Sequence, residues 1–188
     1  MFKNILVPTD GSDLAAKAVE QGVLFAKEIG AKITALTVTE AFHLLSVEPS
    51  QLEYTPIEYK RHAQAHAEKV LGIVSAAAKL AGVDCETLHA EHEHIYQAII
   101  DAAASRRCDL IVMASHGRRG VSAVVLGSET VKVLTHSKIP VLCIVEGESK
   151  VGVWVISGFP RTMDRRAILQ RRPALSWASF SARTLGHE

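Results

Sequence analysis

Residues 114–128 read ASHGRRGVSAVVLGS, and this stretch decides how the rest of the chain is interpreted. An apolar run, Leu110–Met113, precedes it, and a segment with helical periodicity, Glu129–His136, follows it. We therefore expect a glycine-bearing loop between a buried strand and the start of a helix. Backbone N–H groups and the positive end of the helix dipole gather at such a point, and this arrangement suits a phosphate group.

Two glycines and a serine give this loop its binding chemistry. Gly117 and Gly127 allow the backbone to approach a ligand closely, and Ser128 is placed to be an N-cap or a first-turn hydroxyl. A purely structural glycine turn is the alternative, but residue types, spacing and placement together favour a phosphate site. Arg118 and Arg119 are candidate phosphate clamps, although two consecutive residues of an ordered loop do not both point inward.

The rest of the chain alternates between apolar runs and helical patterns. This alternation is typical of an α/β domain with a parallel sheet, doubly wound because the near-continuous apolar strands need helices on both faces. Such sheets bind ligands outside the carboxyl ends of their strands. The loops Pro8–Ser12 and Ala114–Gly127 both follow strands at that edge, and they face each other if these strands are neighbours. The predicted strands are Phe2–Val7, Lys32–Val38, Val83–Ala90, Asp109–Met113 and Val141–Val145.

Composition excludes several classes of function. The chain has 188 residues, of which 48% are hydrophobic, and its formal net charge is +1, so neither nucleic acid nor an anionic membrane is expected as a partner. Its apolar runs are too short to span a bilayer or to act as a signal peptide. Three widely spaced cysteines indicate reduced thiols, and we expect a cytoplasmic protein. The P-loop, dinucleotide-binding and Gly-x-Ser-x-Gly hydrolase motifs do not occur.

The order and spacing of these motifs resemble the universal stress protein family. The matching features are the opening Ile5–Ser12, the strand Asp109–Met113, and the loop, helix and strand from Ala114 through Val145. The resemblance implies a five-stranded parallel sheet in the order 3-2-1-4-5, of the adenine nucleotide alpha-hydrolase-like type. It also implies a homodimer in which the last strands, here Val141–Val145, pair across a two-fold axis.

The ATP-binding members of that family carry the pattern Gly-x2-Gly-x9-Gly-Ser/Thr. This chain matches the spacing but has Ala114 at the first glycine. A methyl group there costs little if the backbone has a negative φ, and it is unfavourable if a positive φ is required. The resemblance implies phosphates at Gly117, Gly127 and Ser128, with Glu129 beside them. It further places Asp10 near the ribose and a phosphate-bound Mg²⁺, Val38 on adenine through its backbone, Pro8 and Met113 along the base and sugar, and His116 at the sugar or phosphates.

The resemblance leads us to expect a homodimeric, stress-response regulator that binds ATP with Mg²⁺. Two of its site residues have alternative roles, because Asp10 also suits a helix cap and His116 a turn cap. No catalytic residue is predicted, and ATP hydrolysis is expected to be slow at most. The competing hypothesis is a dimeric interaction module of the same family with an empty pocket.

The pattern changes at residue 147. Residues 1–146 are expected to form the domain, and residues 147–188 a poorly ordered C-terminal appendage that mixes arginine pairs with Pro160 and Pro173. Within it, only Val151–Ile156 has the character of a strand.

Overall fold

The computed structural model describes residues 2–41, 56–115, 126–146 and 151–157, with residues 56, 145–146 and 151–157 described for the backbone alone. No helix within these ranges is long and apolar enough to cross a membrane. The elements are β1 (Asn4–Pro8), α1 (Asp13–Ile29), β2 (Lys32–Thr39), α3 (Pro56–Ala81), β3 (Cys85–Glu91), α4 (Ile95–Ser105), β4 (Leu110–Ala114), α5 (Ser128–His136), β5 (Val141–Glu146) and β6 (Val151–Ser157).

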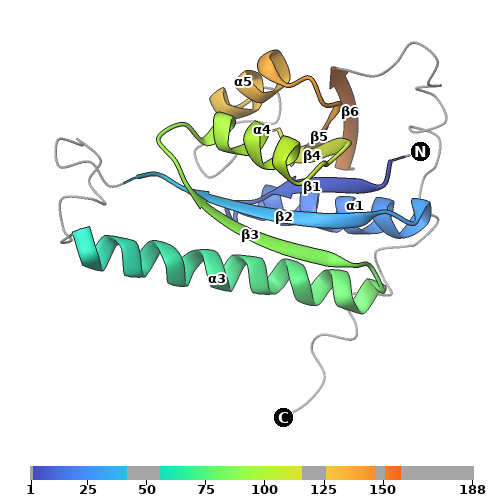
Figure 1. Ribbon diagram of the computed structural model, residues 1–188. Helices are drawn as coiled ribbons and strands as arrows, with labels where there is room; N and C mark the ends of the chain where they lie inside the picture. The colour runs from blue at the N-terminus through green and yellow to red at the C-terminus, as the bar shows by residue number, and fades with distance from the viewer. Residues whose placement is uncertain (1, 42–55, 116–125, 147–150, 158–188) are drawn as a thin grey trace.

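All six strands form one sheet in the order β3-β2-β1-β4-β5-β6 (Figure 1). The first five strands of this order run parallel, which confirms the predicted 3-2-1-4-5 arrangement. The sixth strand, β6, pairs antiparallel with β5. Strand order reverses between β1 and β4, so the switch point lies where the two candidate loops begin.

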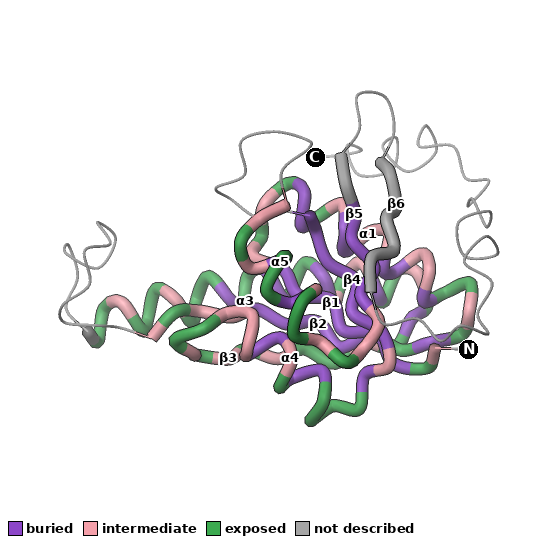
Figure 2. Tube along the Cα trace, turned by 90° about the horizontal axis from the view of Figure 1, so that it is seen from above, coloured by how far each residue is buried: buried purple, intermediate pink, exposed green. Residues whose placement is uncertain are grey.

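The helices cover both faces of the sheet, α1 and α3 on one side and α4 and α5 on the other (Figure 1). Alternate residues of each strand enter opposite cores. On β4, for example, Val112 belongs to the core beneath α1, whereas Ile111 and Met113 belong to the core beneath α4 and α5. Buried residues therefore run along the central strands (Figure 2).

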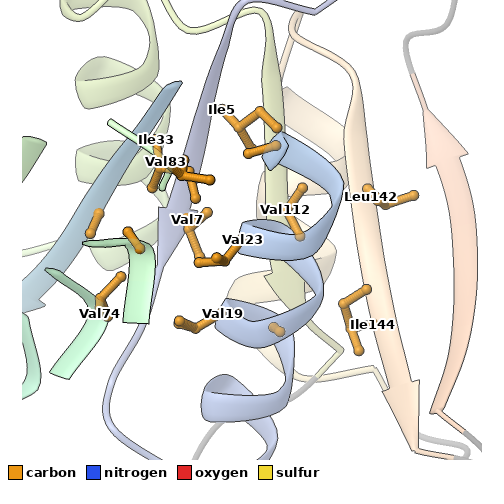
Figure 3. Packing of buried hydrophobic residues seen from close by; sticks show 14 of the residues in the cluster. Ile5, Val7, Val19, Val23, Ile33, Val74, Val83, Val112, Leu142 and Ile144 are labelled. Carbon is orange, nitrogen blue, oxygen red and sulfur yellow. The ribbon is translucent and has the colours of Figure 1, made fainter. Parts of the chain in front are cut away.

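Helix α1 packs closely against the middle of the sheet. Val19 and Val23 on α1 lie beside Val7 of β1 and Val112 of β4 (Figure 3). A Cβ atom on Gly22 would lie 3.2 Å from the Cγ2 atom of Val7, so this glycine allows the close approach. The tight contact fixes the position of the N-terminal end of α1 relative to the carboxyl edge of the sheet.

The outer edge of β5 differs from the sequence-based expectation. Every residue from Val141 to Glu146 has a partner in β6, from Val141 opposite Ser157 to Glu146 opposite Val151. The resemblance implies a homodimer through Val141–Val145; β6 pairs with this same edge of the sheet, and the homodimer stays a prediction. β6 lies in the predicted appendage yet joins the sheet. Residues 147–150 and 158–188 lie outside the described residues, so the domain boundary at residue 146 stays a prediction.

Candidate functional site

The turn between β1 and α1 is anchored to the neighbouring strand β2. The backbone N–H of Thr9 donates to the carbonyl of Leu36 over 2.8 Å, and the hydroxyl of Thr37 donates to the carbonyl of Thr9 over 3.1 Å. Thr9 and Thr37 are buried. These two bonds continue the β1–β2 contact past the last paired residue, Pro8, and hold the turn at the carboxyl edge of the sheet.

Side chains within this turn satisfy its backbone. The carboxylate of Asp10 accepts a hydrogen bond of 3.0 Å from the N–H of Ser12, and the hydroxyl of Ser12 caps α1 by accepting from the N–H of Ala15 over 3.3 Å. Gly11 lies between them with φ +78°, a conformation that favours glycine. Asp10 thus caps the turn. Because a carboxylate accepts several bonds, its role at a metal ion stays a prediction.

The second loop is closed at its base by backbone bonds. The N–H of Ser115 donates to the carbonyl of Ile144 over 2.8 Å, and the N–H of Gly127 donates to the carbonyl of Ser115 over 2.8 Å. The hydroxyl of Thr130 in α5 donates to the carbonyl of Ala114 over 3.1 Å, in a buried position. The end of β4 and the first turn of α5 are therefore joined directly.

Ala114 occupies an ordinary strand position. It is the last residue of β4, opposite Ile144 of β5, and it is 8% exposed. Among the described non-glycine residues, Arg107 alone has a positive φ, so the backbone of Ala114 does not require a glycine. The methyl group at the position of the family's first glycine is consequently tolerated by the backbone.

Helix α5 begins without a side-chain cap from its own N-cap residue. That residue is Gly127, with φ −64° and ψ 152°, and it has no side chain that could accept a bond from the helix. The first N–H groups of any α-helix lack partners within the helix, and they carry the positive end of its dipole. Among the described residues, the N-cap of α5 therefore leaves this helix start as a place whose backbone donors suit an anion.

The two loops begin at the same edge of the sheet. β1 and β4 are parallel neighbours, with Ile5 opposite Leu110 and Leu6 opposite Ile111. The Asp10 turn and the base of the second loop at Gly127 follow these strands, so the structure brings them to one side of the switch point. His116, Gly117, Arg118 and Arg119 lie outside the described residues, and their predicted roles stay predictions.

Of the residues predicted to contact the adenine base and the sugar, Val38 would act through its backbone, whereas Pro8 and Met113 are buried. Val38 lies in β2 two residues beyond Leu36, whose carbonyl faces the β1 side. Strand alternation turns the backbone groups of Val38 to that same side, past the last β1–β2 register pair. Pro8 and Met113 are buried, and Met113 packs in the core beneath α4 and α5.

Glu129 turns toward α4. Its Oε2 atom accepts a hydrogen bond of 2.8 Å from the N–H of Tyr96 in the first turn of α4, and its Oε1 atom accepts one of 2.7 Å from the Nζ of Lys132. The carboxylate raises the pKa of Lys132 through this bond. Because the carboxylate stabilises the start of α4, the structure gives Glu129 a structural role beside its predicted place in the site.

Sequence analysis did not predict three threonines that position the candidate site, nor a cavity near it. Thr9, Thr37 and Thr130 carry the bonds that position both loops, and the sequence signal for them was a hydroxyl at the end of a strand or the start of a helix. A cavity of about 270 Å³ lies beside the carboxyl end of β2, at Thr39. It is lined by Thr39, Glu40, Tyr59, Lys60, Ala63, Gln64, His89 and Glu91.

Comparison with known proteins identifies the family. The model of the universal stress protein family matches residues 1–144. The chain belongs to the universal stress protein family. It is 32% identical over 148 residues to universal stress protein YxiE of Bacillus subtilis (strain 168), an alignment covering 77% of this chain and 99% of that relative.

Two solved structures have a fold similar to that of this chain. The hypothetical protein MJ0577 superposes with a TM-score of 0.66 at 25% identity, covering 80% of this chain and 99% of that one. A universal stress protein solved in complex with cAMP superposes with a TM-score of 0.57 at 26% identity, covering 76% and 97%. Its bound cAMP is an adenine nucleotide.

Proposed function

We propose that this universal stress protein binds ATP, together with Mg²⁺, at the carboxyl edge of its sheet and acts in the cytoplasm as a nucleotide-dependent stress-response regulator. The observation that carries the proposal is that the Asp10 turn and the start of α5 both lie at the carboxyl edge of the sheet, beside the ends of the neighbouring parallel strands β1 and β4. The cAMP complex of a relative supports an adenine nucleotide as the ligand.

The described residues fit a phosphate group. Gly127 has no Cβ, so it leaves room beside the first N–H groups of α5, and Ser128 adds a hydroxyl in the first turn. The ordinary backbone of Ala114 removes the main objection raised by the missing glycine. Gly117, Arg118, Arg119 and His116 complete the proposed phosphate side of the site.

The nucleotide's base and sugar are proposed to lie between the Asp10 turn and the end of β2. The backbone of Val38 is the proposed partner of adenine, because it faces the β1 side beyond the last paired residues. Pro8 and the backbone of Met113 flank this region from the two central strands. Asp10 is the proposed carboxylate for Mg²⁺, which prefers oxygen ligands and bridges phosphates.

A homodimer through Val141–Val145 stays part of this proposal; it would use the edge of β5 with which β6 pairs in the described chain. Bound ATP is proposed to bias the conformation of the second loop, whose base is tied to both β4 and β5. A ligand shifts such an equilibrium by its difference in affinity for the two conformations. No catalytic step is proposed.

Thermal unfolding with and without ATP–Mg²⁺ tests the proposal. At a concentration about one hundred times its Kd, ATP should raise the free energy of unfolding by about 2.7 kcal/mol. The variant Gly127→Val should lose this stabilisation because its side chain fills the phosphate space, while its φ and ψ suit valine and preserve the fold.

The matched control is Gly72→Val, at an exposed position of α3 where a Cβ meets nothing within 4 Å. This variant should keep the full stabilisation by ATP. Absence of stabilisation at millimolar ATP would instead support an interaction module with an empty pocket. An unchanged response of Gly127→Val would place the nucleotide elsewhere.

A further inference from the structure

The cavity of about 270 Å³ lies between α3 and the carboxyl ends of β2 and β3, on the face of the sheet that α3 covers (Figure 1). Four of its lining residues come from α3, and the others come from the ends of the two strands. Pockets for drug-sized ligands have volumes of about 300–1,000 Å³. The cavity therefore has room for a molecule somewhat smaller than these.

The face of the sheet beneath α3 becomes polar as it approaches the cavity. Ala35 of β2 belongs to the core beneath α1 and α3, and Thr39, four residues further along the strand, lies on the same face. Beside Thr39 lies its register partner Glu91 of β3, and His89 precedes Glu91 by two residues. The Oγ1 atom of Thr39 is 3.0 Å from the Nε2 atom of His89. The strands therefore supply a polar floor.

Helix α3 changes its character at the same level. Val74 and Ala67, on the side that faces the sheet, are 2% and 0% exposed. One and two turns nearer the start of the helix, the same side presents Ala63 and Lys60 to the cavity. A helix and a sheet normally meet through apolar residues. Here both layers become polar together, and a cavity remains where the apolar packing ends.

Polar groups around the cavity contact one another and keep capacity for further bonds. The hydroxyl of Tyr59 donates to the backbone carbonyl of Glu40 over 3.1 Å, and the Nζ atom of Lys60 lies 3.5 Å from the Oε1 atom of Glu91. An ammonium group has three donors and a carboxylate accepts several bonds, so these contacts leave donors and acceptors for a ligand.

The charges of the lining indicate which ligand the cavity suits. Glu40 and Glu91 are acidic and Lys60 is the basic residue of the lining, so the formal charge is −1 with His89 neutral. The side chains of Lys60 and Glu91 are 62% and 42% exposed, and an exposed pair of this kind is weak. Among the described residues, the carboxylate of Glu40 has no ion-pair partner. The cavity therefore favours a positively charged molecule.

We propose that this cavity binds a small organic cation through its ammonium group, which pairs with the carboxylates of Glu40 and Glu91. Lys60 competes with this cation for Glu91. A metal ion is a poorer match, because the described residues contain no group of three histidine, cysteine or acidic side chains that could hold one. The site is separate from the proposed nucleotide site, none of whose described residues lines the cavity.

Calorimetric titration of the full chain with putrescine, a diamine of four carbons, tests the proposal at neutral pH and constant ionic strength. The matched ligand is butanediol, which has the same carbon chain and two hydroxyl groups but no charge. Putrescine should bind in the millimolar range or more tightly, and butanediol at least about tenfold more weakly. Absence of putrescine binding at millimolar concentration, or equal binding of the two ligands, would overturn the proposal.

Two variants change the charge of the lining in opposite directions. Glu40→Gln removes a carboxylate and should weaken putrescine binding roughly fivefold, whereas Lys60→Gln removes the competitor for Glu91 and should strengthen it by a similar factor. A merely structural role of Lys60 would not produce tighter binding. Glu28→Gln, at an exposed position of α1, is the control and should change nothing. An unchanged or weaker affinity in Lys60→Gln would contradict the proposal.

A third variant fills the cavity without changing its charge. Ala63→Leu places a larger side chain in the lining and should abolish putrescine binding, while leucine remains favourable in a helix. Ala65→Leu, at an exposed position of α3 outside the lining, should bind putrescine normally. Circular dichroism checks that both variants are folded, and the two charge variants decide the matter if Ala63→Leu is not. Retained binding in a folded Ala63→Leu would overturn the proposal.

The variant Gly127→Val separates this site from the nucleotide site. It should bind putrescine with unchanged affinity, whether or not the unmodified chain binds ATP. Loss of putrescine binding in Gly127→Val would place the cation at the start of α5 and overturn the proposal.

Discussion

Helices α1 and α5 both begin at the carboxyl edge of the sheet, after the neighbouring strands β1 and β4, but their first turns are built differently. At α1, Ser12 caps the helix and Asp10 caps the turn before it. At α5, the N-cap is Gly127, which has no side chain to offer.

The difference suggests a division of roles within one edge. The side chains of the turn before α1 accept hydrogen bonds from its own backbone, and Thr9 anchors the turn to β2. This turn therefore provides a rigid side of the candidate site. The start of α5 is joined to the end of β4 by the hydrogen bond from the Thr130 hydroxyl to the carbonyl of Ala114. Its N-cap residue, Gly127, has no side chain that could cap the first N–H groups of the helix. A binding site needs both a rigid support and donors that a ligand can satisfy.

The largest effect on the free energy of unfolding is expected from Gly11→Ala, which disturbs the rigid turn before α1. The residue has φ +78°, and an added Cβ would lie 2.8 Å from the Cγ2 atom of Val70. We expect the free energy of unfolding to fall by roughly 2–4 kcal/mol, from backbone strain and overpacking together. Chemical denaturation measures this loss.

Two further variants separate these causes. Gly30→Ala has a similar φ of +69° but meets nothing within 4 Å, so it should cost only about 1–2 kcal/mol of backbone strain. In a Val70→Ala background, Gly11→Ala should cost about the same as Gly30→Ala. An equal cost for Gly11→Ala in both backgrounds would show that contact with α3 is irrelevant.

A medium effect is expected from Gly127→Asp, which makes the start of α5 resemble that of α1. The aspartate caps the helix and complements its dipole, so the free energy of unfolding without nucleotide should rise by about 0.3–1 kcal/mol. Its charge should repel phosphate and weaken ATP affinity at least about tenfold, or about 1.4 kcal/mol.

Calorimetric titration measures that affinity, and Gly127→Asn is the uncharged control. The asparagine caps the helix without a charge, so it should weaken ATP binding less than the aspartate does. Equal ATP affinity of Gly127→Asp and the unmodified protein would argue against phosphate at α5.

The smallest effect is expected from Ser12→Ala, which removes the cap of α1. The N–H of Ala15 loses its 3.3 Å bond to Ser12, and the free energy of unfolding should fall by about 1 kcal/mol. Ser12→Gly should lower the free energy of unfolding by only about a few tenths of a kcal/mol. If Ser12→Ala lowers the free energy of ATP binding by more than it lowers the free energy of unfolding, Ser12 contacts the ligand as well as capping the helix.

Much of the fold could be predicted from local sequence. Four of the five parallel strands followed from apolar runs, because such runs must be buried between helices, while the edge strand β3 followed from a weaker pattern, and the resemblance supplied the order of the strands. Both loops of the candidate site were located because their strands end in residues that break strands or cap helices. The individual contacts could not be located in this way. The predicted place of Glu129 beside the ligand stays a prediction, and the sequence did not indicate that its carboxylate accepts a hydrogen bond from the N–H of Tyr96, which is 33 residues away in the chain.

The amino-acid sequence by itself determined the alternation of strands and helices, the family, and the position of both candidate loops, since these depend on periodicity and on short motifs. Only the tertiary structure decided that Ala114 has an ordinary backbone, that Met113 belongs to the core, and that β6 covers the edge of β5. The physical reason is that these properties depend on backbone dihedral angles and on pairing between strands, which local residue patterns do not specify.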